Sequence, residues 1–82
     1  MKKAQALPPR TLDVTGLKCP LPVMKASRLL TVMKKGEQLV VLATDPASLP
    51  DMRGWAKVDD RVTVERQETR DDGVYVHTLR RS

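Results

Sequence analysis

The chain has 82 residues, of which 40% are apolar and 30% charged, and its formal net charge is +5. This length suits one small domain and excludes two separate cores. One cysteine and one histidine exclude an internal disulfide and a zinc site of the Cys/His type, so no metal or other cofactor is expected. The basic residues are scattered, and a mixed solvated surface explains them better than a nucleic-acid patch.

No apolar run approaches the length of a membrane span, and Met1-Lys2-Lys3-Ala4 lacks the apolar segment of a signal peptide. We therefore expect a cytoplasmic protein, whose reducing surroundings keep the single cysteine as a thiol. Residues 1–9 end in Pro8-Pro9 and show no periodicity. They are predicted to be a flexible tail that precedes one domain spanning residues 10–82.

The first half of the domain is predicted to form a strand, a helix and a strand. Residues 10–15 alternate between apolar and polar and Gly16 ends them, whereas residues 22–35 have the three- and four-residue apolar spacing of an amphipathic helix. Lys34 and Lys35 suit the C-terminal end of that helix, and Gly36 suits its stop. Residues 37–43 are nearly all apolar, which predicts a central strand buried on both faces or nearly so, in a right-handed parallel unit with the first strand.

The second half is predicted to form a helix and a hairpin. Ser48 as N-cap and Asp51 at the third helical position match a capping box, which indicates a helix over residues 49–58. Strands at residues 62–65 and 74–79 are joined by the hairpin signal Asp71-Asp72-Gly73. The order β-α-β-α-β-β predicts an α/β (α+β) fold: a two-layer sandwich with a mixed four-stranded sheet and both helices on one face. Because the only aromatic residues are Trp55 and Tyr75, the core should be aliphatic.

The chain is organised around the seven residues Gly16-Leu17-Lys18-Cys19-Pro20-Leu21-Pro22. Two prolines fix the backbone where the first strand gives way to the helix, so the helix should start at about Leu21 or Pro22 with the Cys19 sulfur at its entrance. The positive end of the helix and the cations of Lys18 and Lys25 favour a thiolate there.

The expected effect on the thiol pKa is small. A helix terminus lowers the pKa of an exposed group by less than about one unit. Neither proline has an N–H to donate, which leaves Leu21, Val23 and Met24 as donors. We therefore predict a moderately activated, exposed thiol. The alternative reading is that Cys19 is a small buried core residue, which is the common fate of a free cysteine.

No catalytic apparatus accompanies this nucleophile. His77 falls in the last strand, where we expect a surface residue and not a partner of Cys19. Asp13, Asp45 and Asp51 could approach the helix entrance, but turn and capping roles explain them equally well. A lone activated thiol suits a carrier that accepts sulfur as a persulfide from one enzyme and presents it to the next. Two alternatives are a thiol redox sensor and a non-catalytic RNA-binding or regulatory module that uses the basic surface.

The framed motif resembles the TusA-type sulfur carrier family, whose hallmark is Cys-Pro-x-Pro. The resemblance covers about residues 10 to 80 and rests on four segments: Leu12-Asp13-x-x-Gly16-Leu17-Lys18-Cys19-Pro20-x-Pro22-Val23, Gly36-Glu37-x-Leu39, Asp45-Pro46-Ala47 and Asp51-Met52. It implies a sandwich like the C-terminal domain of bacterial translation initiation factor three. It also implies that Cys19 carries the persulfide, framed by Asp13, Gly16, Pro20 and Pro22.

The resemblance further implies partner proteins: a sulfur donor such as a cysteine desulfurase or a rhodanese, and an acceptor of the DsrE-like type. Members of the family serve tRNA thiolation, molybdenum-cofactor maturation or sulfur oxidation. The chain differs from some members of the family at three positions: Leu21 stands where they have an acidic residue, Thr44 where they have an aspartate, and Ala56 where they have a second cysteine. Partners are expected to dock over the first helix, where Lys18, Lys25 and Arg28 could form a basic rim; a merely solvated helix face explains each of them about as well.

Overall fold

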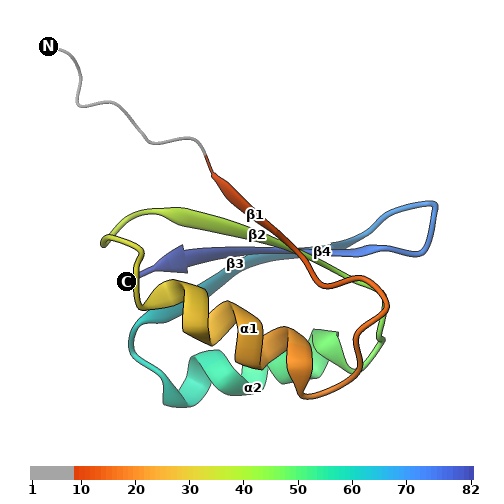
Figure 1. The fold of residues 1–82 in the computed structure, drawn as a ribbon, viewed down its shortest axis with the longest axis horizontal. Helices are drawn as coiled ribbons and strands as arrows, with labels where there is room; N and C mark the ends of the chain where they lie inside the picture. Colours follow the sequence, from red (N-terminus) through yellow and green to blue (C-terminus); the bar gives the residue numbers. More distant parts are fainter. Residues whose placement is uncertain (1–8) are drawn as a thin grey trace, which may run out of the picture.

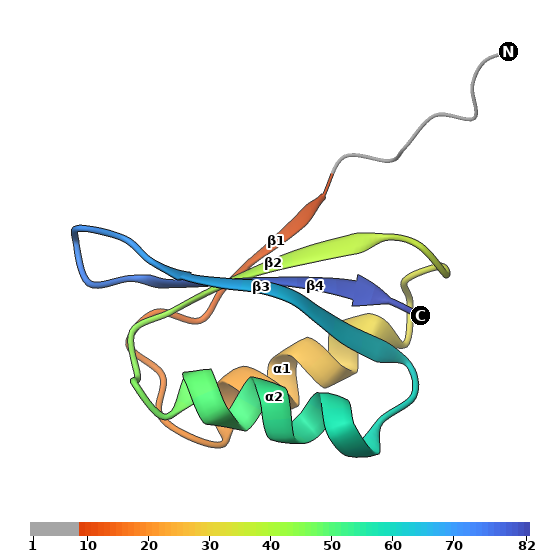
Figure 2. The same ribbon diagram turned by 180° about the vertical axis from the view of Figure 1, so that it is seen from behind.

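The structure, a computed structural model, describes residues 9–82 and has two layers. One layer is a sheet of four strands, β1 (Arg10–Asp13), β2 (Gln38–Ala43), β3 (Val62–Thr69) and β4 (Tyr75–Arg81). Helices α1 (Leu21–Leu30) and α2 (Ser48–Val58) form the other layer, and both lie on the same face of the sheet (Figure 1, Figure 2). The expected fold class and element order are confirmed. The predicted tail lies outside the described residues except for Pro9, which is exposed.

The sheet is mixed, with strand order β1-β2-β4-β3. Strand β1 pairs in parallel with β2, while β4 is antiparallel to both β2 and β3. The β3–β4 hairpin turns at the predicted place, where Gly73 has a φ of +86°, a value that glycine adopts without strain. Strands β3 and β4 are longer than predicted because their polar residues pair across the hairpin as well as the apolar ones do.

The core between the layers is aliphatic, as expected, and consists of Val14, Ala26, Leu30, Met33, Leu39, Val41, Ala43, Met52, Val62 and Leu79. The prediction that β2 is buried on both faces, or nearly so, holds fully for one face only. Leu39, Val41 and Ala43 are buried, whereas Val40 and Leu42 on the opposite side are only partly buried. The reason is that both helices cover the same face, which leaves the second face of this central strand without a layer above it.

Helix α1 ends at Leu30, five residues before the predicted end. Beyond it the chain continues in tighter turns, since Thr31, Val32 and Met33 each donate a backbone N–H to a carbonyl three residues earlier. Thr31 also donates its hydroxyl to the Arg28 carbonyl at 2.7 Å, and two successive β-branched residues are poor helix formers. Lys34 and Lys35 therefore lie outside the helix and do not cap it.

The start of α2 also differs from the prediction. Ala47 occupies the N-cap position without a side-chain hydrogen bond, and Ser48 is the first helical residue. The Ser48 hydroxyl is buried and lies 2.9 Å from Nε2 of His77. The expectation that His77 is a surface residue was wrong, because its side chain points from β4 into the layer between sheet and α2 and has no exposed area.

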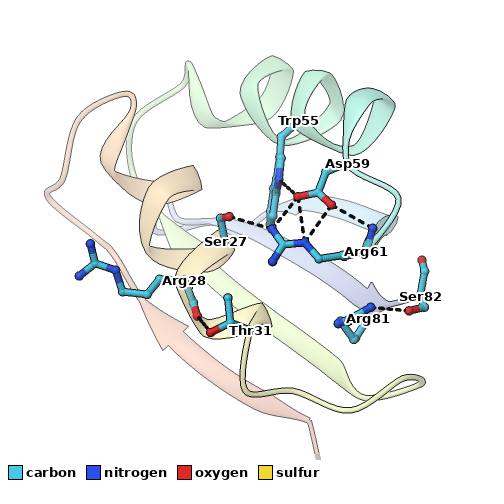
Figure 3. A network of polar contacts seen from close by, with 8 residues as sticks. All are labelled: Ser27, Arg28, Thr31, Trp55, Asp59, Arg61, Arg81 and Ser82. Atoms are coloured by element: carbon cyan, nitrogen blue, oxygen red, sulfur yellow. Dashed lines mark hydrogen bonds and ion pairs between the residues drawn. The ribbon is translucent and has the colours of Figure 1, made fainter.

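A polar network links the C-terminal end of α2 to α1, far from the β1–α1 loop (Figure 3). The Asp59 carboxylate, which follows α2, accepts hydrogen bonds from the Arg61 guanidinium at 2.7 Å and from Trp55 Nε1 at 2.9 Å. Arg61 also donates to the Ser27 hydroxyl of α1 at 3.1 Å. These hydrogen bonds hold the pKa of Asp59 far below its ordinary range, with the side chain of Arg61 as the largest cause.

Candidate functional site

Cys19 lies at the start of α1, with Pro20 as the N-cap residue and Leu21 as the first helical residue. This agrees with the helix start that the two prolines predict. Its side chain is exposed, so the expectation of an accessible thiol is confirmed over that of a buried core cysteine. Pro22, three residues further along the chain, is buried.

A turn closed by side-chain hydrogen bonds precedes Cys19. The Asp13 carboxylate accepts the Thr15 backbone N–H at 2.9 Å and the Thr15 hydroxyl at 2.7 Å, which closes a turn at the end of β1. Gly16 follows with a φ of +82°, which favours glycine. Two of the four predicted framing residues, Asp13 and Gly16, thus shape the backbone that leads to the thiol.

The β2–α2 loop holds the thiol loop from the other side. Gly16 donates its backbone N–H to the Thr44 hydroxyl at 2.8 Å, and Cys19 donates its own to Oδ2 of Asp45 at 2.8 Å. The second oxygen of Asp45 accepts the N–H of Ala47 at 3.1 Å. These hydrogen bonds keep the pKa of Asp45 below its ordinary value, with the Cys19 N–H as the largest cause. Asp45 therefore stays ionised beside the thiol.

The prediction that the Cys19 pKa is lowered was wrong: the pKa of the thiol is raised. The largest cause is its hydrogen bond to the Asp51 carboxylate, followed by partial desolvation and by the negative charges of Asp51 and Asp45. The N-terminal end of α1 does little to lower this pKa, since the N–H groups of Leu21 and Met24 already donate to the carbonyls of Lys18 and Pro20.

The sequence left open whether Asp51 approaches the helix entrance or only caps α2, and it did not predict an effect of Asp51 on the thiol. The place of Asp51 in the first turn of α2 brings its carboxylate close to the sulfur of a cysteine 32 positions earlier in the chain. The signal that could have identified it was its position, because the β2–α2 loop and the β1–α1 loop must both lie at the edge where β1 and β2 end.

The surface around Cys19 combines apolar and cationic side chains. Leu21 is 41% exposed and Met24 is 52% exposed, on the first turn of α1. Lys18, Lys25 and Arg28 are all exposed, and none of them forms an ion pair with another residue of the range 9–82. Figure 3 shows the Arg28 side chain extended away from α1. Shallow grooves of about 420 and 410 Å³ flank this helix, one beside Leu12 and the other beside Trp55.

Two further observations concern the part of the chain that the structure describes. It contains no group of three or more histidine, cysteine, aspartate or glutamate side chains arranged to hold a metal ion. None of its helices has the length and apolar character needed to cross a lipid bilayer.

The fold and the site together define a class of protein: a small two-layer α/β domain that presents a single exposed thiol, between a proline-rich helix start and a pair of carboxylates. Comparison with known families specifies it further. The chain belongs to the family described as Sulfurtransferase TusA, whose family model matches residues 10–81. The expected membership of this family is thereby confirmed.

Individual relatives agree with this assignment. A protein of Halobacterium salinarum is 44% identical over 72 residues, which cover 88% of this chain and 88% of the relative. The Sulfur carrier protein TusA of Allochromatium vinosum is 40% identical over 68 residues, or 83% of this chain and 86% of that protein. The crystal structure of the SirA-like protein from Desulfitobacterium hafniense superposes with a TM-score of 0.73 at 25% identity, covering 85% of this chain and 93% of that one.

Proposed function

We propose that this protein is a sulfur carrier that accepts sulfane sulfur as a persulfide on Cys19 and hands it to a partner protein in a cytoplasmic sulfur relay. The observation that carries the proposal is the exposure of its only thiol at the start of α1, within the residues that the family model matches. The name of the Allochromatium vinosum relative, a sulfur carrier protein, supports the same function.

Each transfer is an exchange between sulfur atoms with no net oxidation. The Cys19 thiolate attacks the outer sulfur of a donor persulfide, the sulfur–sulfur bond of the donor breaks, and the donor leaves as a thiolate while a new sulfur–sulfur bond forms on Cys19. A thiolate of the acceptor protein then attacks the outer sulfur on Cys19. That bond breaks in turn, and Cys19 is released as a thiolate.

The carboxylates beside Cys19 shape both steps. Because they raise the pKa of the thiol, Cys19 is held in its protonated form at neutral pH, next to the Asp51 carboxylate. A protonated thiol resists oxidation better than a thiolate, which protects an exposed cysteine between transfers. Attack requires the proton to leave, and the Asp51 carboxylate is the adjacent acceptor. Once formed, a thiolate of higher basicity is the stronger nucleophile.

The proposed partners are a donor such as a cysteine desulfurase or a rhodanese and an acceptor of the DsrE-like type, within tRNA thiolation, molybdenum-cofactor maturation or sulfur oxidation. The exposed Leu21 and Met24 offer an apolar contact next to the sulfur. Lys18, Lys25 and Arg28 around them would attract an acidic partner and orient it over α1.

The alternative of an RNA-binding module gains no support from the two aromatic side chains. Trp55 and Tyr75 are partly buried, and the indole nitrogen of Trp55 is bound to Asp59. Neither offers the open stacking surface that single-stranded RNA recognition uses.

Intact-mass measurement after sulfur loading tests the proposal. The protein is incubated with a cysteine desulfurase and cysteine, and its mass is recorded before and after treatment with a reductant. We expect a reductant-sensitive gain of one sulfur atom that is absent in Cys19→Ser. Equal loading of Cys19→Ser, or no loading from either a desulfurase or a rhodanese, would contradict it.

A further inference from the structure

His77 is the only histidine of the chain, it is fully buried, and the proposed sulfur transfer does not use it. It lies on β4 between its partners Val41 of β2 and Gln67 of β3, and its ring faces α2. Both ring nitrogens have hydrogen-bonding neighbours: Nε2 is 2.9 Å from the Ser48 hydroxyl and Nδ1 is 3.1 Å from Nε2 of Gln67. A buried imidazole that forms hydrogen bonds through both ring nitrogens holds the groups around it in place.

The hydrogen bonds fix which ring nitrogen carries the proton. The amide of Gln67 is oriented by two unambiguous partners, since its Nε2 donates to the Leu49 carbonyl at 2.9 Å and its Oε1 accepts from Arg53 at 2.7 Å. The second hydrogen of that Nε2 therefore points at Nδ1 of His77, which must accept. Nε2 of His77 then carries the hydrogen and donates it to the Ser48 hydroxyl oxygen.

This network connects the sheet to the thiol loop through consecutive hydrogen bonds. His77 holds the side chain of Ser48, and the backbone N–H of Ser48 donates to the Asp45 carbonyl at 2.9 Å. The Asp45 carboxylate in turn accepts the backbone N–H of Cys19 at 2.8 Å. The turn that Ser48 begins also carries Asp51, whose N–H donates to the Ala47 carbonyl at 3.0 Å.

We propose that neutral His77, in the form protonated at Nε2, is a positioning residue that holds the first turn of α2, with Asp45 and Asp51, against Cys19. It does not touch the sulfur and acts through Ser48 and, by way of Gln67, through the Leu49 carbonyl. Its effect on thiol reactivity follows from the geometry, whereas its effect on sulfur delivery rests on the proposed function.

The surroundings of the ring oppose a second proton. The side chains bonded to it, Ser48 and Gln67, are neutral, and the charged group behind Gln67 is the cation of Arg53. A proton on Nδ1 would face the N–H of the Gln67 amide, donor against donor. Burial also lowers the pKa of His77, so the ring stays neutral at physiological pH.

Nitrogen NMR of the wild-type imidazole tests the assignment directly, because a single histidine gives one set of ring signals. At neutral pH we expect a neutral ring with hydrogen on Nε2 and none on Nδ1. A ring protonated on Nδ1 alone, or a doubly protonated ring, would overturn the proposal. This measurement needs no variant and no sulfur donor.

Thiol alkylation rates across a pH series test the positioning role. In Ser48→Ala the anchor of the turn is lost, the carboxylates move away from the sulfur, and we expect alkylation by iodoacetamide at neutral pH to be severalfold faster, with the rate profile displaced to lower pH. Gln67→Met, at a partly exposed site, should change the profile in the same direction. Ser27→Ala is the matched control, because it removes a serine hydroxyl bonded to Arg61 and should leave the profile unchanged.

A double variant separates positioning from general loosening. Asp51→Asn alone should also speed alkylation, and adding Ser48→Ala to it should have a clearly smaller effect than in the wild type, since the anchor acts mainly through that carboxylate. A profile unchanged in Ser48→Ala and Gln67→Met, or an undiminished effect of Ser48→Ala in the Asp51→Asn background, would refute the role. Because iodoacetamide replaces any sulfur donor, these results stand or fall independently of persulfide loading.

Discussion

Replacing Asp59 by asparagine should weaken the junction between the two helices whose N-terminal ends flank Cys19. The carboxylate accepts hydrogen bonds from the Arg61 guanidinium, the Arg61 backbone and the Trp55 indole at 2.7, 2.9 and 2.9 Å. Asparagine has nearly the same shape but carries no charge, and its NH2 group replaces one of the two oxygens that accept from these donors. A hydrogen bond to a charged group contributes about 1.5–3 kcal/mol to the free energy of unfolding. Because the Asp59–Arg61 pair is partly exposed, we take the lower half of this range and expect Asp59→Asn to lower the free energy of unfolding by about 2 kcal/mol.

The same prediction has a defined pH dependence. The pKa of Asp59 is held far below the 3.8 that is ordinary for aspartate, so its contribution to stability is fully present above about pH 4 and is lost as the pH falls further through the folded-state pKa. Urea unfolding at neutral pH and near pH 3 should show the stability difference between wild type and Asp59→Asn shrinking at the lower pH. Glu68→Gln is the control, because the exposed Arg66–Glu68 pair should contribute almost nothing. A difference that is independent of pH, or no larger than that of the control, would refute the reasoning.

Three further outcomes are expected. Burial lowers the pKa of His77 from 6.5, so below about pH 6.5 the imidazole is protonated in the unfolded chain but not in the folded one, and the stability should fall with the pH. The midpoint of urea unfolding should show this pH dependence in the wild type and not in His77→Gln. Gly16→Ala forces a side chain into a φ of +82° and should cost about 1 kcal/mol or more in urea unfolding, whereas Gly54→Ala, in helical backbone with open space around it, should be neutral or stabilising. Reversing the charge of Lys25 and Arg28 together should slow sulfur delivery to an acidic partner about tenfold at low salt, and rates equal to wild type at low salt would show that the basic rim has no part in docking.

The element order and the helix start could be predicted because they depend on local patterns. Alternating residues in β1, the hairpin signal at Gly73 and the prolines on either side of Leu21 each act on the backbone within a few residues. The end of α1 was mispredicted because the turns after Thr31 keep Met33 in the core without a helix, so that the same apolar spacing fits both structures.

The electrostatics of the site could not be predicted, because they depend on contacts between segments distant in the chain. The sequence places Lys18 next to Cys19, which suggests a lowered thiol pKa, but the fold brings Asp51 and Asp45 to the sulfur from α2 and the loop before it. Likewise, the sequence of β4 does not show which of its faces a helix covers, so a polar residue such as His77 was expected at the surface. Its burial follows from the pairing of Ser48 with the inner face of β4, which a single sequence does not reveal.

The central claim, that Cys19 carries sulfur between proteins, is tested most directly by following labelled sulfur through a complete relay. The protein is loaded by a cysteine desulfurase from cysteine labelled at sulfur, freed of the desulfurase and mixed with a DsrE-like acceptor, and the intact masses of both proteins are recorded over time. The account predicts that one labelled sulfur leaves Cys19 as one appears on the acceptor. Label retained on Cys19, or label reaching the acceptor equally well when Cys19→Ser is taken through the same steps, would contradict it.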